Sequence, residues 1–407
     1  MTTLSETFDV VVVGGGPSGS TAATDLARRG RSVLLLDRAG RIKPCGGAIP
    51  PVLIKEFDIP ESLLVARVTS ARMVSPAGKC VDMPINGGYV GMVDRDVFDE
   101  FLRERAASAG TVRRAGTFES ITHDDEGVAV VHFRAPGAPR GVDTHSVRAR
   151  AIIGADGAAS SVARQSIPGA DRIPYVYAYH EIVRSPRNGE KDATGAVAGF
   201  DGARCDVYYQ GPLSPDFYSW IFPHGDTTSV GTGTARKGMS IRDSVGALRA
   251  SAGLAASETI RREGAPIPLR PLRKWDNGRD VVLAGDAAGV VAPASGEGIY
   301  YAMAGGRLAG DAVEAFLATG DARALATARK RFMKAHGRVF WILGIMQRFW
   351  YANDKRRERF VSICRDPDVQ ELTWQAYMHK KLVRAKPLAH VRIFFKDMAH
   401  LTGLVRP

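Results

Sequence analysis

The hydrophobic pattern of the chain begins with a largely apolar, β-branched run, Phe8 to Val13, that lacks regular alternation. Such a run is typical of a strand buried on both faces of a parallel sheet. A glycine-rich turn follows, and Ser20 to Arg29 has the periodicity of a helix that Gly30 ends. Val33 to Leu36 has the pattern of a second buried strand. The pattern therefore predicts one βαβ unit of about 30 residues.

Beyond this unit the pattern changes several times. Asp96 to Ala109 has helical periodicity, and the alternation between Gly116 and Ala155 predicts a β-meander. Residues 172–266 mix short strands, aromatic residues and turns without a βαβ rhythm. Val281 to Ala284 predicts another buried strand, and the pattern is helical and basic from about Asp321. Together these patterns predict an α/β fold, α+β overall, with more than one domain.

The composition is that of a globular protein: 407 residues, 45% hydrophobic and 24% charged. The four cysteines are widely spaced and form no cluster with metal-ligand spacing, so no metal site is predicted. Few, scattered cysteines are typical of a reducing cytosol. No signal peptide is visible, and the longest later apolar stretch, Val339 to Met346, is too short to span a bilayer. We therefore expect a cytoplasmic protein that is soluble or peripheral on a membrane.

The positive charge is concentrated in the last part of the chain. Lys330 to Pro407 contains 17 Lys/Arg and 6 Asp/Glu, which is +11 of the net +12. An aromatic segment, Phe340 to Tyr351, precedes the cluster Lys355-Arg356-Arg357. Aromatic and basic residues together suit an interfacial contact with acidic lipid, although a solvated helical surface would have the same composition. No motif for reading DNA or RNA accompanies the charge, so nucleic acid is not a predicted partner.

Gly14-Gly15-Gly16-Pro17-Ser18-Gly19 matches the dinucleotide fingerprint between a predicted strand and a predicted helix. Its first glycine allows the tight turn, the second lets the backbone approach a pyrophosphate, and the third lets the helix pack on the strand. Asp37 lies 23 residues after Gly14, where an acidic residue binds ribose hydroxyls. The alternative is a glycine-rich turn without a ligand. The residues expected to bind the dinucleotide here are Gly14, Gly16, Pro17, Ser18, Gly19, Asp37 and its neighbour Arg38.

A second glycine-bearing turn favours FAD over NAD. Gly285-Asp286 follows a predicted strand, and a glycine-rich segment with Gly296 and Gly298 leads into a helix. The carboxylate of Asp286 can accept hydrogen bonds from a ribityl or ribose hydroxyl. The backbone N–H groups near Gly296 and Gly298 can meet phosphate or the pyrimidine edge of a flavin.

This second turn resembles the FAD motif of hydroxylase-type flavoproteins with the glutathione-reductase fold. Gly154-Ala155-Asp156-Gly157, followed by Ser160, Ser161 and Arg164, is similar to the Asp-Gly motif of the same group. The resemblance implies a Rossmann-like FAD-binding domain with an antiparallel-sheet substrate domain. A plain alternative remains for Arg95, as an exposed cation at a helix start, and for Asp156, as the cap of a turn. The further FAD contacts that it implies are Cys45, Gly46, Arg95, Asp156, Asp286, Pro293, Gly296, Gly298 and Ile299.

Other strings resemble the geranylgeranyl reductase family, and its chlorophyll and bacteriochlorophyll branch in particular. These strings are Lys43 to Pro50 (KPCGGAIP), Glu56 to Pro60 (EFDIP) and Tyr218 to Pro223 (YSWIFP). The resemblance implies NADPH-dependent saturation of three of the four double bonds of a geranylgeranyl chain. The substrate would be geranylgeranyl diphosphate or a prenylated tetrapyrrole, geranylgeranyl-(bacterio)chlorophyll(ide). The family usually has Glu at the ribose position, where this chain has Asp37; its shorter side chain still allows the hydrogen bond.

The resemblance also implies a substrate site. Candidate proton donors are Cys45, Tyr218 and a bound water, and His180 and His224 are weaker candidates because a lone histidine is more often structural. Tyr218, Trp220 and Phe222 alternate and so share one face of a strand, which would suit either an apolar tunnel or ordinary core. Cys45 would equally fit a small buried residue. The predicted substrate-binding residues are Gly46, Gly47, Tyr218, Trp220 and Phe222.

From these patterns we predict four segments. Residues 1–170 and 271–329 form the FAD-binding domain, 171–270 an antiparallel substrate domain, and 330–407 a basic helical extension. Two other functions remain open on the same fold: an FAD-dependent aromatic monooxygenase and a flavin-bound assembly or pigment-carrier protein.

Overall fold

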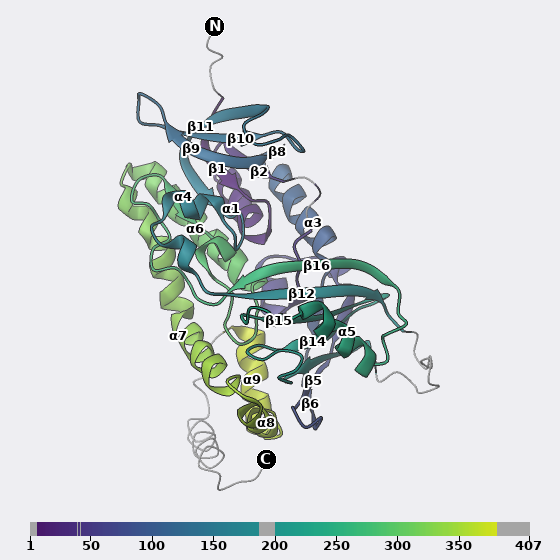
Figure 1. Cartoon of the computed structure of the whole chain (residues 1–407). Coiled ribbons are helices and arrows are strands. Elements are labelled where there is room, and N and C mark those ends of the chain that lie inside the picture. The colour runs from purple at the N-terminus through teal and green to yellow at the C-terminus, as the bar shows by residue number, and fades with distance from the viewer. Residues whose placement is uncertain (1–5, 39, 41, 187–199, 381–407) are drawn as a thin grey trace. The chain divides into compact units, whose positions relative to one another are not determined.

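The computed structural model describes residues 6–38, 40, 42–186 and 200–380, and it divides into two compact units (Figure 1). The first unit contains the chain up to Lys43, then Arg95–Tyr175 and Pro266–Trp341. The second contains Pro44–Asp94, Val176–Ala265 and the chain from Ile342 on. Each unit is built around its own sheet.

The sheet of the first unit has the buried strand β1 (Thr7–Val13) at its centre. Its parallel neighbours are β2 (Val33–Asp37) and β11 (Thr144–Gly154), and β8 (Val112–Ala115) extends the sheet beyond β2. The end of β11 pairs in parallel with β17 (Val281–Leu283), while its start pairs antiparallel with β10 (Ala129–Arg134). β9 (Thr117–His123) completes the meander. The predicted βαβ unit and the predicted β-meander are both confirmed.

Five helical elements of the first unit matter for the site. They are α1 (Pro17–Arg28), α3 (Arg95–Ser108), α4 (Ser161–Ser166), the short η3 (Gly285–Ala288) and α6 (Ile299–Thr319). α1 begins at Pro17, three residues before the predicted start, because the proline suits the first helical turn and Gly16 precedes it as the N-cap. The turn that joins β1 to α1 is therefore shorter than the sequence pattern indicated.

α6 packs directly against the start of α1, and glycine makes this possible. A Cβ atom added at Gly306 would lie 2.1 Å from the backbone oxygen of Ser18, closer than any real contact. A Cβ at the adjacent Gly305 would lie 3.6 Å from its nearest neighbour, which is ordinary van der Waals contact. The backbones of the two helices thus meet at Gly306 and Ser18 without a side chain between them.

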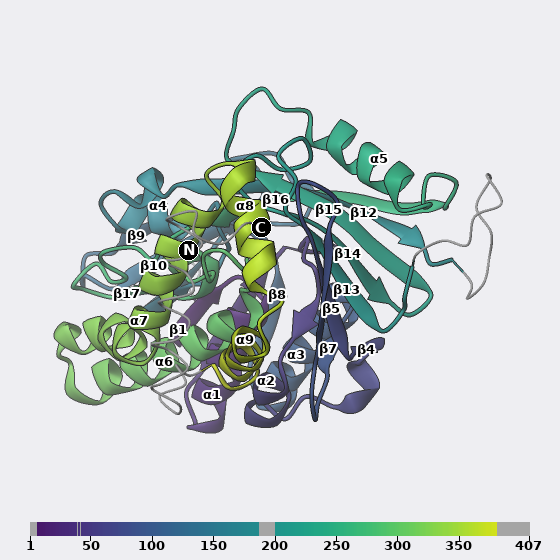
Figure 2. The same ribbon diagram turned by 90° about the horizontal axis from the view of Figure 1, so that it is seen from below.

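The second unit is built on a sheet of order β16-β12-β15-β14-β13-β5-β6. α5 (Ile241–Ser251) covers one face, with Val245 and Leu248 packed on Val183 and Val230 (Figure 2). A small three-stranded sheet and the helices α2 (Pro51–Glu56), α8 (Asp354–Ile363) and α9 (Pro367–His379) complete this unit. The strands of the large sheet are β5 (Ser70–Val74), β6 (Cys80–Pro84), β12 (Tyr175–Arg184), β13 (Arg204–Tyr208), β14 (Ser219–His224), β15 (Thr227–Thr234) and β16 (Thr259–Pro268). The small sheet contains β3 (Ala48–Ile49), β4 (Ala66–Val68) and β7 (Val90–Met92).

The division into units differs from the predicted domain boundaries at two places. Residues 44–94, predicted within the first part of the FAD-binding domain, belong to the second unit because β5 pairs in parallel with β13. The described part of the predicted extension, residues 330–380, is divided between the two units. Helix α7 (Thr327–Trp350) starts in the first unit, and Met378 of α9 packs with Val68 and Cys205 of the second.

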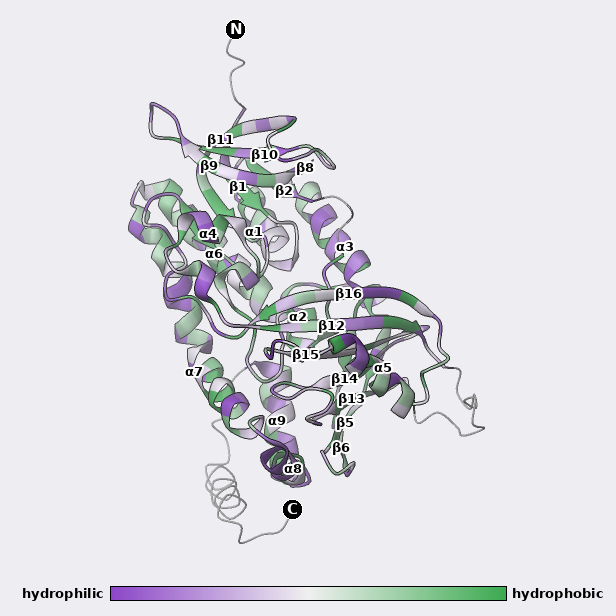
Figure 3. Ribbon diagram, viewed as in Figure 1, coloured by the Kyte–Doolittle hydropathy of each residue, from purple (hydrophilic) through white to green (hydrophobic). Residues whose placement is uncertain are grey.

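The aromatic C-terminal segment is also more buried than a lipid-facing surface would be. Phe340, Trp350 and Tyr351 are buried, whereas Trp341 is 68% exposed. Arg357, predicted in a lipid-facing basic cluster, is 1% exposed and donates hydrogen bonds to the backbone oxygens of Pro215 and Tyr351. Although hydrophilic residues dominate α8 (Figure 3), the Arg357 side chain holds this helix to the backbone of Pro215 in the same unit. In the described part of the chain, no helix is both long enough and apolar enough to cross a bilayer.

The contact at Gly306 leads to a prediction with a matched control in the next residue. We expect Gly306→Ala to lower the free energy of unfolding by about 2 kcal/mol or more, because the overlap with Ser18 outweighs the roughly 1 kcal/mol gained in helix propensity. Gly305→Ala adds the same methyl group without an overlap, so its free energy of unfolding should stay level or rise. Denaturant unfolding of both variants measures this. Equal stability of the two would contradict the close approach.

Candidate functional site

The turn between β1 and α1 has the geometry of a phosphate-binding turn. Gly14 has a φ of +107°, and a Cβ there would lie 2.3 Å from the Ala155 oxygen. A Cβ at Gly19 would lie 1.8 Å from the Gly14 oxygen, so both glycines are required by packing. At Gly16, by contrast, an added Cβ would meet no described atom within 4 Å. Gly16 therefore faces open space at the N-terminus of α1, where free N–H groups attract an anion.

Ser18 connects this turn to the second glycine-bearing turn. Its side chain is 5% exposed, yet its Oγ has no hydrogen-bond partner among the residues described. A Cβ added at Gly285, which has a φ of +63°, would lie 2.8 Å from the Ser18 Cβ. A buried hydroxyl without a partner indicates that a ligand supplies one. The two turns, far apart in sequence, thus lie side by side, and the residues present fit the pyrophosphate-bearing half of FAD.

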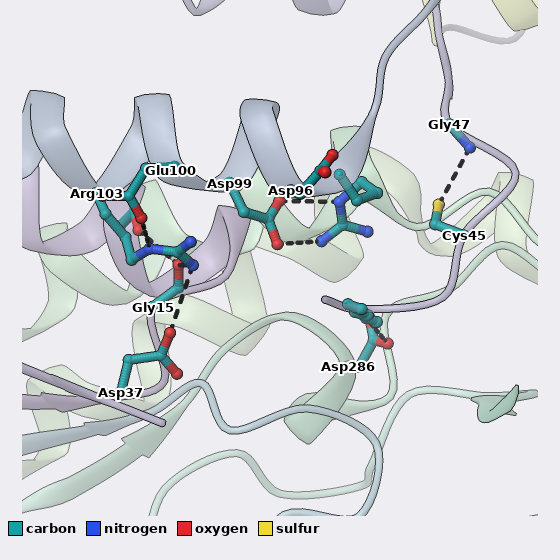
Figure 4. A network of polar contacts seen from close by, with 12 residues as sticks. Gly15, Asp37, Cys45, Gly47, Asp96, Asp99, Glu100, Arg103 and Asp286 are labelled. Atoms are coloured by element: carbon teal, nitrogen blue, oxygen red, sulfur yellow. Dashed lines mark hydrogen bonds and ion pairs between the residues drawn. The ribbon is translucent and has the colours of Figure 1, made fainter. Parts of the chain in front are cut away.

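Asp37 ends β2 beside the same turn, and an arginine that the sequence analysis missed holds it there. Nη1 of Arg103 lies 3.4 Å from Oδ2 of Asp37 and 3.3 Å from the backbone oxygen of Gly15 (Figure 4). Nε of Arg103 donates to Glu100 at 2.7 Å. Arg103 lies on α3 eight residues after Arg95, on the same side of the helix. This spacing is the feature of the sequence that could have indicated Arg103 as a second site residue. The neighbouring Arg38 is exposed.

Arg95 is a buried residue, so the alternative of an exposed cation at the start of a helix is wrong. Its side chain is 4% exposed. Nε and Nη2 donate to the two carboxylate oxygens of Asp99 at 2.8 and 2.7 Å. Because Asp99 is buried as well, the pair is a desolvated, bidentate ion pair that fixes the first turn of α3. A direct contact of Arg95 with a flavin stays a prediction.

Asp156 is engaged by its own loop. Its carboxylate accepts hydrogen bonds from the Ser160 hydroxyl and from the backbone N–H groups of Ser161, at 2.6 Å, and Val162, at 3.2 Å. Burial raises the pKa of Asp156, although these hydrogen bonds act in the opposite direction. These contacts cap the start of α4, in agreement with the alternative role of Asp156 as the cap of a turn. A contact with FAD is still predicted but is not needed to account for this residue.

The loop after β17 combines a buried charge with a strained backbone. Asp286, whose side chain is 6% exposed, forms an ion pair with Lys43. Lys43 belongs to the KPCGG string, but no role was predicted for it. Ala294 has a φ of +63°, a rare conformation for alanine, and lies between Pro293 and Ser295. Gly298 is the N-cap of α6, which Ile299 begins. Backbone strain of this kind is common at ligand-binding loops, and the predicted contacts Pro293, Gly296, Gly298 and Ile299 all lie here.

In the second unit, the loop that contains Cys45 lies on the strand that contains the aromatic residues. A Cβ added at Gly46 would lie 2.9 Å from Cδ2 of Phe222. A Cβ at Gly47, which has a φ of +70°, would lie 2.5 Å from Nε2 of His224. The backbone N–H of Gly47 points to the Cys45 sulfur at 3.4 Å (Figure 4). Two strings nearly 180 residues apart in sequence therefore form one surface.

Tyr218, Trp220 and Phe222 form a row of rings on β14 and the residue before it. The ring centroids are 6.0 Å apart for the first pair and 6.2 Å apart for the second. Tyr209 continues the row beyond Tyr218 at 6.3 Å, and Tyr351 lies 5.3 Å from Tyr209. We call these five rings the aromatic row. It ends on the glycine loop at Phe222 and on the C-terminal segment at Tyr351.

His224 continues the same strand face but is not a suitable acid at neutral pH. Burial lowers its pKa to about 4. The neutral ring therefore bonds through Nδ1 to the backbone oxygen of Phe222, at 3.1 Å. This leaves Cys45, Tyr218 and a bound water as the stronger candidate proton donors. In the part of the chain that the structure describes, no group of three or more His, Cys, Asp or Glu side chains is arranged to hold a metal ion.

Two family models match the chain. The FAD binding domain model matches residues 66–336, and the FAD dependent oxidoreductase model matches residues 9–81. The geranylgeranyl diphosphate reductase of Rhodobacter capsulatus is 56% identical over 401 residues, 98% of this chain and 99% of that protein. The geranylgeranyl diphosphate reductase of Synechocystis is 36% identical and covers 96% of this chain and 97% of its own length.

The fold is shared with a solved structure. The crystal structure of a geranylgeranyl bacteriochlorophyll reductase-like protein from Thermoplasma acidophilum aligns with a TM-score of 0.79 at 21% identity. The alignment covers 98% of this chain and 100% of that one. At this level of identity the likeness shows the fold alone.

Proposed function

Because this chain belongs to the geranylgeranyl diphosphate reductase family, we propose that it reduces three isolated double bonds of a geranylgeranyl chain to phytyl, with NADPH as the source of electrons. The chain is an oxidoreductase with an FAD-binding domain. The proposed substrates are geranylgeranyl diphosphate and geranylgeranyl-(bacterio)chlorophyll(ide). The observation that carries the proposal is the seating of the Cys45–Gly47 loop on Phe222 and His224, which joins two of the family's strings into one wall.

The residues around the first turn would hold the cofactor. The free N–H groups at the start of α1 and the Ser18 hydroxyl would bind the pyrophosphate, and Asp37 would accept hydrogen bonds from ribose hydroxyls. Arg103 orients the Asp37 carboxylate and partly balances its charge. Asp286, which is paired with Lys43, would accept hydrogen bonds from the flavin side chain. FAD, when bound, supplies the hydride that the alkene carbon receives.

The residues of the second unit would bind the substrate and supply a proton. An isolated trisubstituted alkene has no carbonyl to stabilise negative charge, so a proton must add to its less substituted carbon as hydride reaches the other. Such an alkene is a very weak base, and the donor therefore has to be well placed in a site from which water is excluded. The aromatic row offers an apolar wall for the C20 chain. Cys45 and Tyr218 lie on or beside this wall.

The activity is tested with purified, FAD-reconstituted protein and NADPH under anaerobic conditions. We expect at least one of the two proposed substrates to gain the mass of the six hydrogens that three double bonds take up, measured by mass spectrometry. Turnover that requires O₂ and yields an oxygenated product would instead identify a monooxygenase. FAD binding without NADPH oxidation on either substrate would indicate a carrier and overturn the proposal.

The same assay tests Cys45 as the proton donor. We expect Cys45→Ala to slow alkene reduction about 100-fold, the lower range for losing a positioned acid, while NADPH-dependent flavin reduction stays unchanged. Cys80 is exposed on β6, outside the site, and Cys80→Ala is the matched control. Stopped-flow flavin absorbance and product analysis separate the two steps. Unchanged alkene reduction in the Cys45 variant would remove this residue as the donor.

We also propose that one face of α7 contacts acidic lipid, where a prenylated substrate resides. Support comes from an exposed stripe at helical spacing that combines cations with apolar side chains. Trp341 is 68% exposed and Ile345 is 47% exposed. The cations of the stripe are attracted by an anionic surface. The stripe consists of Lys334, Arg338, Trp341, Ile345 and Arg348. Predicted basic residues beyond Lys380 lie outside the described residues.

Vesicle sedimentation tests this stripe. Binding to anionic phosphatidylglycerol vesicles should exceed binding to neutral phosphatidylcholine vesicles, and Trp341→Ser should weaken it several-fold because the indole would enter the interface. Tyr177, also aromatic and 58% exposed, lies on β12, and Tyr177→Ser is the control that should bind normally. An equal loss in both variants, or none in either, would exclude the stripe as the docking surface.

A further inference from the structure

A line of polar side chains, buried from Trp220 to His180, starts at the aromatic row of the second unit. Nε1 of Trp220 donates to Oγ of Ser229 at 3.0 Å, and the same Oγ lies 2.9 Å from Nδ1 of His180. Nε2 of His180 lies 2.9 Å from Oε2 of Glu263. Nε of Arg261 lies 2.6 Å from the other oxygen of Glu263. We call these five residues the polar line; it crosses four strands, β14, β15, β12 and β16.

The polar line exists because a glycine lets the indole lie flat. Trp220, Gly231 and His180 are directly opposite one another on neighbouring strands, so they share a sheet face. A Cβ added at Gly231 would lie 2.2 Å from Cζ2 of Trp220 and 2.7 Å from the His180 Cβ. The indole therefore covers the β15 backbone, which brings its N–H to Ser229. A side chain at position 231 would push the ring away from both partners.

The hydrogen bonds of the polar line agree with one direction of donation. Tryptophan Nε1 can only donate, so the Ser229 oxygen accepts there and its own hydrogen can go to Nδ1 of His180. With Nδ1 accepting, the Nε2 hydrogen of His180 is donated to Glu263. Burial by itself would raise the pKa of Glu263, but the His180 hydrogen bond and the charge of Arg261 lower it below its usual value. The Glu263 carboxylate thus accepts hydrogen bonds from His180 and Arg261 at the end of the polar line that is opposite Trp220.

Ser229, His180 and Glu263 superficially have the composition of a nucleophilic triad, but they are not one. Ser229 is 0% exposed, and its oxygen is already bonded to the Trp220 indole. A nucleophile must reach a substrate carbon, which this hydroxyl cannot do. What the arrangement does control is the indole: releasing its N–H would leave a buried donor unpaired, which opposes rotation of the ring.

We propose that Ser229, His180 and Glu263 are positioning residues that lock the Trp220 indole and so set the register of a methyl-branched prenyl chain along the aromatic row. The inference rests on the proposed function, because it takes the row as the wall of the prenyl site. A fixed ring presents one shape to the chain at each of three successive reductions. A ring free to rotate would let the chain bind in several registers, which weakens binding and leaves double bonds unreduced.

The test compares two serines that are equally buried on opposite faces of the same strand pair. Ser229→Ala removes the acceptor of the indole N–H, while Ser219→Ala removes a buried hydrogen bond to Thr232, at 2.8 Å, on the face away from Trp220. Both serines are 0% exposed, so the general loss of stability should be similar. Glu263→Gln is a second variant that weakens the far end of the line without touching the serine.

We expect Ser229→Ala and Glu263→Gln to raise KM for the geranylgeranyl substrate about tenfold, as for the loss of one buried hydrogen bond. The kcat for the first reduction and NADPH-dependent flavin reduction should stay within about twofold, and partly reduced chains should accumulate. In ¹⁵N-tryptophan spectra the Trp220 indole resonance, identified with Trp220→Phe, should move in these variants. In Ser219→Ala it should remain in place.

Equal kinetic effects of Ser229→Ala and Ser219→Ala would overturn the inference, because the line would then act only through stability. If Ser229→Ala does not fold, Glu263→Gln tests the inference by the same readouts: KM, the accumulation of partly reduced chains and the Trp220 indole resonance. If the wild-type protein reduces no prenyl substrate, the proposed function fails. If the wild-type protein reduces the substrate but the Trp220 indole resonance does not move in Ser229→Ala or Glu263→Gln, only the positioning role is excluded.

Discussion

The backbone contact between the start of α1 and α6 is the constraint on which the first unit depends. Gly306 meets the Ser18 oxygen, and Gly285 meets the Ser18 side chain, with no room for a Cβ at either place. These contacts bring the turn after β1 and the turn after β17 together, although nearly 270 residues separate them. The result is a set of N–H groups beside a buried hydroxyl that has no partner among the described residues, which suits an anionic dinucleotide. The proposed pyrophosphate contacts of this unit follow from that approach.

The second unit uses glycine for a different purpose. Gly46 and Gly47 let a loop lie on Phe222 and His224, and Gly231 lets the Trp220 ring lie on its neighbouring strand. In the first unit glycine joins backbone to backbone, whereas here it joins backbone to aromatic ring. A wall made in this way is closely packed, and the indole N–H of Trp220 donates to Ser229 on the neighbouring strand. That combination is suited to an apolar chain without polar groups of its own.

Long-range pairing explains where the sequence-based predictions failed. Residues 44–94 lie in the second unit because β5 pairs with β13, and the periodicity of either strand does not indicate its partner. Of the basic cluster at 355–357, Arg357 alone is buried, which the charge pattern of a sequence does not indicate. The Arg357 guanidinium donates hydrogen bonds to the backbone oxygens of Pro215 and Tyr351 and is therefore not available to a lipid surface. Arg103 was missed because its target, Asp37, lies on a strand 66 residues earlier.

The sequence by itself determined the local elements and the chemistry that short-range patterns encode. The apolar run of β1, the glycine fingerprint and Asp37 at the end of β2 predict the dinucleotide turn because strand, turn and helix are adjacent in the chain. The alternation at 218–222 likewise placed three rings on one face. Only the tertiary structure decided which surfaces these elements meet: Ser18 against Gly285, the Cys45 loop against Phe222, and Trp220 against the Ser229, His180 and Glu263 line. Those contacts depend on strand order and on close approach in space, and neither leaves a periodic trace in the sequence.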